Sequence, residues 1–472
     1  MTHVFHPTVL REYDIRGIIG ETLGPDDARA IGRSFGTLLR RAGSRGDNNP
    51  KVAVGYDGRV SSPMLEGALV EGLNASGCDV VKVGMGPTPM LYYAAASAEE
   101  VDGGIMITGS HNPANYNGFK MVFQGRPFFG EDILGVGRMS AAGDWEDGTG
   151  TFESREILEE YVERLLVPLA AVSGETLEGL KVGWDAGNGA AGPALEMLAA
   201  RLPGEHHLLF TEVDGNFPNH HPDPTVEANL EDLRRLVAQK NLDFGVAFDG
   251  DGDRIGAIDG EGRVIWGDQL LMIYAEDLLQ RMPGSTIIAD VKASRALFDH
   301  VAEHGGTPVM WKTGHSLIKS KMKETGSPLA GEMSGHVFFA DEYYGFDDAL
   351  YAGVRLMTSA ANLGKSVTEL RSAMPSMINT PEMRFQVDES RKFAAIDEVK
   401  ERLAASPANV DGTDGVRVTT DDGWWLLRAS NTQDVLVARA ESNSEDGLER
   451  LMEQIDEQLA ASGLQRGESV GH

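Results

Sequence analysis

A serine hydroxyl stands in residues 108–113 (TGSHNP), directly after the apolar residues 104–107. The apolar run predicts a strand, and a strand that ends there presents Ser110 at the carboxyl edge of a sheet, where open α/β sheets bind their ligands. Esterases carry their nucleophile in Gly-x-Ser-x-Gly, but Thr108 and Asn112 occupy the flanking positions, so that class is excluded. Ser110 is therefore a candidate nucleophile for another group transfer, with a polar turn that hydrogen bonds its own backbone as the alternative.

Three carboxylates, those of Asp249, Asp251 and Asp253, alternate with glycines just before Arg254. Glycine allows the backbone to fold tightly, so the three side chains can converge on one point. Three anions that close repel one another strongly without a cation, and oxygen-only ligands favour Mg²⁺ or Ca²⁺ over zinc. An EF-hand needs Gly and Glu where Arg254 and Gly260 stand, which excludes that site. With the serine, this loop indicates phosphoryl transfer; a solvated acidic turn is the alternative.

Two further loops carry groups suited to a sugar and to a phosphate. Residues 331–336 (GEMSGH) place polar side chains between glycines, which suits hydroxyl recognition, although an ordinary polar loop has the same composition. Residues 428–432 (RASNT) offer a guanidinium, two hydroxyls, an amide and backbone N–H groups, a set that favours phosphate binding. Each loop alone is a weak signal.

Residues 187–192 (GNGAAG) match the dinucleotide-binding fingerprint and follow a predicted strand. Glu212 and Asp214 stand at a plausible distance for a ribose contact. An NAD-dependent oxidoreductase is thus the rival enzyme class, although it gives no role to the three aspartates. The alternative is a tight turn between a strand and a helix that binds no cofactor.

The elements that must position these loops follow one pattern, in which an apolar run ends in aspartate and leads into a helical segment. The runs are residues 51–57, 180–185, 244–249 and 286–290. Strands that alternate with helices predict largely parallel sheets. The last hundred residues differ and predict an α+β module, with helices at 390–404 and 444–461, short strands around Val416 and Trp425, and a strand at 435–438.

A chain of 472 residues is too long for one core and predicts three or four domains. Polar, glycine-rich breaks lie at residues 141–151 and 259–262, and prolines mark a third break at 374–381. These breaks predict domains at 1–155 with the serine loop, 156–260 with the aspartate loop, 261–375 with the sugar loop and 376–472 with the phosphate loop.

Charge and composition narrow the class of partner and the compartment. The net charge of −30 disfavours nucleic acid and anionic membranes, and it requires a local basic cleft if the substrate is a phosphate ester. Neither a signal peptide nor an apolar run of ~20 residues is visible. Cys78 is the single cysteine, so an internal disulfide is excluded and a reducing, cytoplasmic setting is expected.

Taken together and in this order, the motifs resemble the α-D-phosphohexomutase family, and most closely its bacterial phosphomannomutase/phosphoglucomutase branch. Residues 11–17 (REYDIRG) and 214–222 (DGNFPNHHP) extend the likeness almost end to end. The resemblance implies three related α/β domains and a C-terminal α+β domain around a central cleft. It also implies a monomeric isomerase that interconverts hexose 1-phosphate and hexose 6-phosphate through a phosphoserine and a hexose 1,6-bisphosphate, with Mg²⁺ as cofactor and the bisphosphate as activator. Phosphoglucosamine mutase and a non-catalytic sugar-phosphate binder are the alternatives.

The resemblance assigns roles by matching position. It implies that Ser110 is carried as phosphoserine and completes a Mg²⁺ site with Asp249, Asp251 and Asp253. The other implied catalytic residues are Arg16, His111, Lys120 and Arg254, with Lys120 or His111 as proton shuttle. The implied substrate-binding residues are Tyr13, Lys292, His315, Glu332, Ser334, His336, Arg428, Ser430, Asn431 and Thr432. Glu332 and Ser334 are expected to bind hydroxyls that mannose and glucose share. Similar sequences carry a proline soon after that threonine, whereas Asp434 here adds a negative charge beside the phosphate loop.

Overall fold

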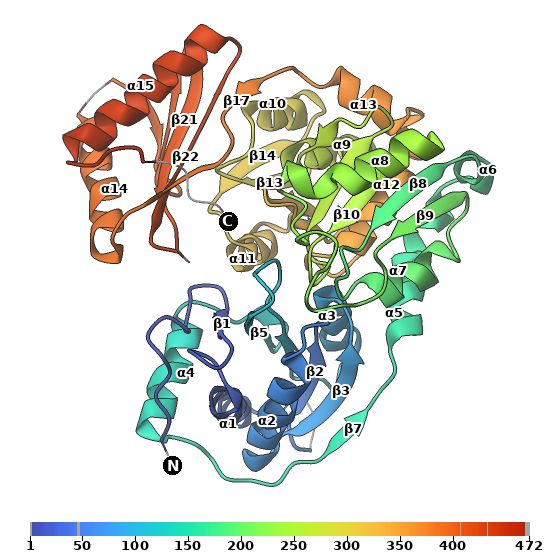
Figure 1. Cartoon of the computed structure of the whole chain (residues 1–472), viewed down its shortest axis with the longest axis vertical. Coiled ribbons are helices and arrows are strands. Elements are labelled where there is room, and N and C mark those ends of the chain that lie inside the picture. The colour runs from blue at the N-terminus through green and yellow to red at the C-terminus, as the bar shows by residue number, and fades with distance from the viewer. Residues whose placement is uncertain (1, 45–47, 406, 432, 468–472) are drawn as a thin grey trace.

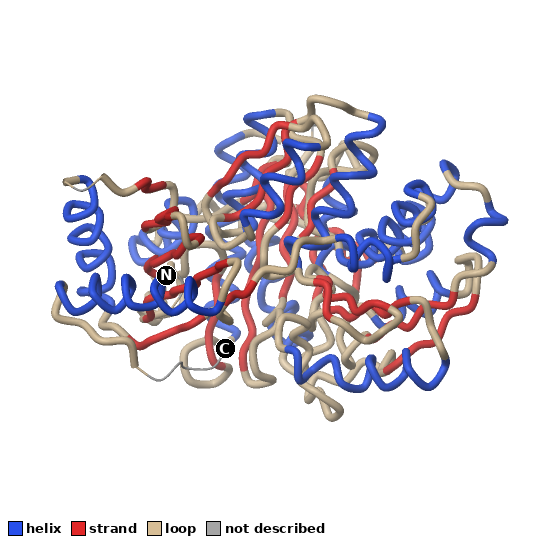
Figure 2. Tube along the Cα trace, turned by 90° about the horizontal axis from the view of Figure 1, so that it is seen from above, coloured by secondary structure: helices blue, strands red, loops and turns tan. Residues whose placement is uncertain are grey.

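The computed structural model of the chain describes residues 2–44, 48–405, 407–431 and 433–467. Four sheets with their helices follow one another along the chain and curve around a common centre (Figure 1). Seen from above, strands lie at both sides and in the centre of the molecule, with helices packed beside them throughout (Figure 2). Within the described ranges, no helix is both long and apolar enough to cross a membrane.

The first sheet has the strand order β1-β5-β4-β2-β3-β7, and β6 pairs with β5. Its strands are β1 (Ile15–Ile18), β2 (Lys51–Tyr56), β3 (Asp79–Met85), β4 (Gly103–Ile107), β5 (Tyr116–Phe123), β6 (Arg126–Pro127) and β7 (Phe152–Ser154). Its helices are α1 (Pro25–Ala42), α2 (Ser62–Ala75), α3 (Thr88–Ser97) and α4 (Glu131–Ala142). Val52 and Val54 of β2 pack with α1 and α2 on one face, whereas Ala53 packs with α3 on the other. Because both faces are covered, β4 is apolar throughout and ends directly before the serine loop.

The second sheet has the order β12-β11-β10-β8-β9. Its strands are β8 (Lys181–Asp185), β9 (Glu205–Leu209), β10 (Phe244–Phe248), β11 (Ile255–Asp259) and β12 (Val264–Ile265), with helices α5 (Leu158–Leu165), α6 (Gly174–Glu178), α7 (Gly192–Ala199) and α8 (Glu231–Lys240) and the 3₁₀ turns η1 (Val167–Ala171) and η2 (Glu227–Leu230). The antiparallel pair β10 and β11 holds the aspartate loop between its strands. Residues 259–262 form a turn inside this sheet, which continues to Ile265.

The third sheet has the order β14-β13-β15-β16. Its strands are β13 (Thr286–Asp290), β14 (Thr307–Trp311), β15 (Leu329–Gly331) and β16 (Val337–Phe339), with helices α9 (Gly267–Arg281), α10 (Arg295–Glu303), α11 (His315–Thr325), α12 (Ala349–Leu363) and α13 (Val367–Ala373). The predicted sugar loop connects the antiparallel strands β15 and β16. Side chains of α9 and α12 join the core that also fills the second sheet, so the second and third sheets share one apolar interior.

The fourth sheet is antiparallel in the order β17-β22-β21-β20-β19, and β18 also pairs with β22. Its strands are β17 (Ile378–Asn379), β18 (Met383–Gln386), β19 (Asn409–Asp411), β20 (Val416–Thr420), β21 (Gly423–Ala429) and β22 (Val435–Ser442), with helices α14 (Glu389–Ala404) and α15 (Glu445–Ala461). The two helices pack on one face, while Trp424 and Leu426 pack against Val291 of the third sheet. The predicted α+β module is confirmed, but β22 is longer than the predicted strand at 435–438.

Candidate active site

Ser110 lies on a tight turn that begins where β4 ends. Its φ of 49° is in the left-handed region, which costs a non-glycine residue about 1–2 kcal/mol and therefore needs support from its surroundings. The Ser110 N–H donates to the hydroxyl of Thr108 at 2.8 Å. The Ser110 hydroxyl, buried in the protein, donates to Oδ2 of Asp249 at 3.0 Å and lies 3.2 Å from Nδ1 of His111. The serine and aspartate loops, predicted separately, thus meet at this hydroxyl.

Arg59 holds the serine turn, a role that the sequence analysis did not predict. Its side chain is 1% exposed and lies 3.1 Å from Oδ2 of Asp57, the residue that follows β2. Its guanidinium donates four hydrogen bonds of 2.6–3.0 Å to backbone carbonyls, those of Ser110, Asn112, Pro113 and Tyr116. Asp57 also accepts from the N–H of Gly109 at 3.0 Å. Because the planar guanidinium presents fixed donors, it specifies the path of the turn.

The three aspartates are fully buried, and their ligand oxygens lie within 4.8 Å of one another. Oδ1 of Asp251 and of Asp253 are buried without a hydrogen-bond partner among the described residues. Burial and the charges of Asp251 and Asp253 raise the pKa of Asp249 well above its ordinary value. Orphaned carboxylate oxygens in a buried, crowded set are what a hard divalent cation would satisfy.

Lys120 and Arg254 place two positive charges beside these carboxylates. Nζ of Lys120, on β5, lies 2.7 Å from Oδ2 of Asp251 and also pairs with Asp253. Burial alone would lower the pKa of Lys120, but the carboxylates of Asp251 and Asp253 outweigh it and raise that pKa. Nε of Arg254 donates to Nε2 of His336 at 3.1 Å. Lys120 therefore holds its proton here, which favours a charge-stabilising role.

Each sheet with its helices is called a unit below, numbered in chain order. Arg16 and Tyr13 are the residues by which the first unit contacts the rest of the site. The guanidinium of Arg16 donates to Asn112 in the serine turn and pairs with Asp14. The Tyr13 hydroxyl donates to the carbonyl of Thr313 at 2.9 Å and accepts from Nδ2 of Asn431 at 2.6 Å. Tyr13 thus connects the first unit with the third and the fourth.

The loop between β15 and β16 directs Glu332, Ser334 and His336 into the same space. Oε1 of Glu332 accepts from the N–H of Gly314 at 2.6 Å, and burial raises the pKa of Glu332. Nδ1 of His336 lies 3.0 Å from Oδ2 of Asp347. The ring of His315 stacks on His336 with centroids 5.4 Å apart. Asp347 is a supporting carboxylate that the sequence did not single out.

The fourth unit closes the site opposite the serine. Nε of Arg428 donates to Oδ2 of Asp414 at 2.9 Å, and Ser430 and Asn431 follow on the same loop. Thr432, predicted to bind phosphate, lies outside the described residues. Nζ of Lys292 donates to Oε2 of Glu382 at 3.0 Å, so that carboxylate connects the third and fourth units. Asp434 lies 3.9 Å from Nζ of Lys392.

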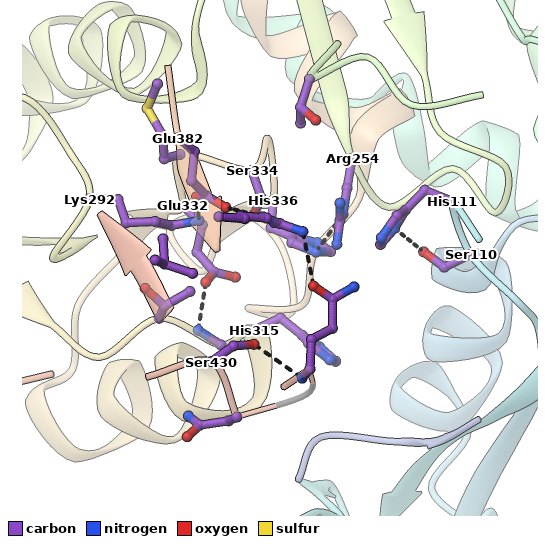
Figure 3. Close-up of a pocket in the computed structure, with 18 of the residues that line it drawn as sticks. Ser110, His111, Arg254, Lys292, His315, Glu332, Ser334, His336, Glu382 and Ser430 are labelled. Atoms are coloured by element: carbon purple, nitrogen blue, oxygen red, sulfur yellow. Dashed lines mark hydrogen bonds and ion pairs between the residues drawn. The ribbon is translucent and has the colours of Figure 1, made fainter. Parts of the chain in front are cut away.

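These groups line one cleft of about 750 Å³ to which all four units contribute. In Figure 3, Ser110 and His111 lie at one end of it and Lys292 and Glu382 at the other. The three aspartates adjoin this end of the cleft through the contact between Asp249 and Ser110. The predicted residues that line the cleft are Tyr13, Arg16, Ser110, His111, Lys120, Arg254, Lys292, His315, Glu332, Ser334, His336, Arg428, Ser430 and Asn431.

Comparison with known proteins decides the family. Four family models match along the chain: phosphoglucomutase/phosphomannomutase alpha/beta/alpha domains I, II and III at residues 7–139, 159–262 and 266–377, and the C-terminal domain at 382–458. The chain belongs to the phosphoglucomutase/phosphomannomutase family. The predicted family and its four-domain α/β architecture are thereby confirmed.

Relatives of this family match over nearly the whole chain. A phosphomannomutase/phosphoglucomutase of Pseudomonas aeruginosa is 46% identical over 454 residues, 96% of each chain. A phosphoglucomutase of Neisseria gonorrhoeae is 41% identical over 94% of this chain and 95% of its own. The crystal structure of a phosphoglucomutase/phosphomannomutase family protein from Burkholderia thailandensis has a TM-score of 0.90 at 43% identity and covers 99% of this chain and 100% of its own.

The dinucleotide-like turn has a structural role in this member of the family. The N–H of Ala190 donates to the carbonyl of Gly250 at 3.0 Å, and a Cβ on Gly189 would lie 2.8 Å from that same oxygen. Residues 187–192 therefore pack on the aspartate loop, which leaves no room for a pyrophosphate to approach their backbone. The glycines serve close packing between two loops, and the oxidoreductase alternative loses its site.

The basic cleft that the sequence analysis expected for a phosphate ester is also present. The cleft lining of this family member contains eight arginine or lysine side chains against four aspartates or glutamates. The cations are Arg11, Arg16, Lys120, Arg254, Lys292, Arg384, Arg428 and Arg439. A chain with net charge −30 thus presents a cationic surface where an anionic substrate would bind.

Proposed function

We propose that this chain is a phosphohexomutase, an intramolecular phosphotransferase that interconverts the 1-phosphates and 6-phosphates of mannose and glucose. The observation that carries the proposal is the buried Ser110 hydroxyl, 3.0 Å from Asp249, at one end of a cationic cleft. A relative named for both activities matches at 46% identity, and one named phosphoglucomutase matches at 41%. The hexose phosphate binds in the cleft as a small-molecule partner.

Ser110 carries a phosphoryl group at the start of the cycle. The free hydroxyl oxygen of a bound hexose 1-phosphate attacks phosphorus, and the bond from phosphorus to Oγ of Ser110 breaks as the new P–O bond forms. The hexose 1,6-bisphosphate then reorients within the cleft, so that its 1-phosphate faces Ser110. Oγ of Ser110 then takes the phosphoryl group from the 1-position, which leaves hexose 6-phosphate. Such a reaction depends chiefly on positioning and on charge neutralisation.

The proton of the attacking hydroxyl needs an acceptor near Ser110. Nδ1 of His111 lies 3.2 Å from Oγ of Ser110, and imidazole changes its charge near neutral pH. Lys120 is paired with two carboxylates and keeps its proton. We therefore assign the proton transfer to His111, and to Lys120 and Arg254 the stabilisation of charge on the transferring group.

The aspartates provide a site that fits Mg²⁺. Asp249, Asp251 and Asp253 supply only oxygen, and two of their oxygens are orphaned. We assign Mg²⁺ to these three side chains and the phosphate on Ser110. Bound there, the ion would offset negative charge on the transferring phosphoryl group.

The remaining residues hold the sugar and its second phosphate. Glu332 and Ser334 bind the hydroxyls at carbons 3 and 4. Mannose and glucose differ only at carbon 2, so this loop accepts both sugars. His315 and His336 complete this wall of the cleft. Arg428, Ser430 and Asn431 bind the phosphate that does not react, and Arg16, Tyr13 and Lys292 line the path between the two ends.

The test is conversion of glucose 1-phosphate and mannose 1-phosphate with Mg²⁺ and a hexose 1,6-bisphosphate activator. Ser110→Ala should lose turnover and should retain no label from a ³²P-labelled bisphosphate, whereas Ser97→Ala, which removes an exposed serine hydroxyl, should keep both. Equal rates in wild type and Ser110→Ala would refute the mutase. Binding of glucose 1-phosphate without turnover in either protein would indicate a sugar-phosphate binder. The four domain limits, the monomeric state and the cytoplasmic location stay predictions.

A further inference from the structure

A second group of metal-binding side chains lies on α9 and α10, outside the set that lines the cleft. Glu276 on α9, His300 on α10 and His304 directly after α10 bring one carboxylate oxygen and two imidazole nitrogens within 4.8 Å of one another. The two helices pack side by side above the third sheet (Figure 1). His300 and His304 are four residues apart, which places both rings on one face of a helical turn.

The distances match those of a tetrahedral site. Oε2 of Glu276 lies 3.5 Å from Nε2 of His300 and 4.0 Å from Nε2 of His304. Zinc bonds of about 2.0–2.2 Å at tetrahedral angles place ligand atoms roughly 3.3–3.5 Å apart. The three atoms therefore need only a small side-chain rotation to share one ion.

The hydrogen bonds around the cluster leave the ligand atoms available. Nδ1 of His304 lies 2.9 Å from the carbonyl of His300 and must donate to it, so Nε2 keeps its lone pair. Nε2 of His300 is buried and has no hydrogen-bond partner among residues of the described chain. Nζ of Lys365 lies 3.3 Å from Oε1 of Glu276, which leaves Oε2 facing the imidazoles.

We propose that Glu276, His300 and His304 bind a transition-metal dication of the Zn²⁺ class, with water as the fourth ligand. Two imidazoles and one carboxylate are a ligand set for zinc, whereas the all-oxygen aspartate loop suits Mg²⁺. The ion connects α9 to α10 and takes no part in the chemistry of the cleft. Its effect is to stabilise the third unit by binding the folded form alone.

The test is calorimetric titration of the full chain with Zn²⁺ in excess Mg²⁺, which competes with Zn²⁺ for the aspartate loop. Wild type should bind one Zn²⁺ that His304→Ala binds more than about 100-fold more weakly, because a direct ligand contributes at least as much as a supporting contact. His304 is exposed, so its removal should spare the fold, and Glu276→Gln repeats the test from the other helix. His6→Ala, which removes an exposed histidine outside the cluster, should bind as wild type does.

A variant of opposite sign makes the test sharper. Lys365→Met removes the ammonium beside Glu276 and should bind Zn²⁺ several-fold more tightly. With Co²⁺ as probe, wild type should show the strong visible absorption of a four-coordinate ion, and His304→Ala should lose it. Zn²⁺ should raise the melting temperature of wild type but not that of His304→Ala. Equal Zn²⁺ affinity in wild type, His304→Ala and Glu276→Gln would overturn the proposal, as would octahedral Co²⁺ in wild type.

Discussion

Arg59→Met tests whether the serine turn depends on the guanidinium beneath it. The substitution keeps the apolar length of the side chain but removes its donors to the carbonyls of Ser110, Asn112, Pro113 and Tyr116. It also leaves Asp57, which is 2% exposed, without its cation. Loss of one partner of a buried ion pair costs about 3–5 kcal/mol. The four lost hydrogen bonds belong to the same network and are not added to this figure.

The cost should fall on the turn, because the carbonyls of Ser110, Asn112 and Pro113 lose their donors. Each 1.36 kcal/mol is a factor of ten, so amides of residues 109–112 should exchange with solvent between about 10²- and 10⁴-fold faster. A displacement of about 1 Å at the reacting atom costs about 100-fold in rate, and we expect a loss of kcat of that size with a smaller change in KM. Hydrogen exchange read by mass spectrometry and steady-state kinetics measure the two effects.

Two further variants make the outcome decisive. Arg59→Lys retains the positive charge beside Asp57 but replaces the planar guanidinium with a single ammonium. It should therefore restore slow hydrogen exchange more fully than it restores kcat. Arg138→Met removes an exposed arginine that pairs with Glu131 at the surface, and it should match wild type in both assays. Unchanged exchange at residues 109–112 together with wild-type kcat in Arg59→Met would refute the positioning role.

Two other predictions follow from single contacts. Burial raises the pKa of Asp348 to about 7, against an unfolded value of about 3.9, so the folded protein binds this proton more tightly than the unfolded chain. The free energy of unfolding should therefore fall by up to about 4 kcal/mol as pH rises from about 4 to about 7. Asp348→Asn should remove that part of the pH dependence of stability measured by urea unfolding, and an unchanged pH dependence would contradict the prediction. Gly250→Ala would place a Cβ 2.6 Å from the backbone carbonyl of Ser110 and should lower kcat/KM about 100-fold, whereas Gly67→Ala, with open space around it, should not.

The sequence predicted those site residues that combine a reactive side chain with a position at the end of a strand. Ser110 follows a buried strand, and the three aspartates follow β10, so both loops were expected at strand ends and do meet there. Arg59 escaped prediction because its contacts with the serine turn are to backbone carbonyls, which carry no side-chain signal. Asp347 and Glu382 escaped because each contacts the site through another side chain, His336 or Lys292, and stands in no motif of its own.

One error of the sequence analysis has a physical cause. Strand β22 continues to Ser442 because Arg439 and Glu441, which interrupt the apolar pattern, are buried and paired. Nη1 of Arg439 donates to the carbonyl of Lys292 at 2.7 Å, and Oε1 of Glu441 accepts from Ser294 at 2.9 Å. At residues 187–192 the structure has the tight turn that the sequence analysis gave as the alternative to a dinucleotide site, since close packing of two loops can require the same glycines.

The charge of the chain and the charge of the cleft act at different distances. At physiological ionic strength the Debye length is about 8 Å, so acidic residues on the outer surface are largely screened from a substrate that has entered the cleft. Within the cleft, cations outnumber carboxylates, and the carboxylates that are present already have partners such as Gly314 for Glu332 and Lys292 for Glu382. The lining therefore decides whether a phosphate ester binds. Beside this lining, the Tyr13 hydroxyl bonds both Thr313 and Asn431, so a single side chain connects three of the units that bring the charges together.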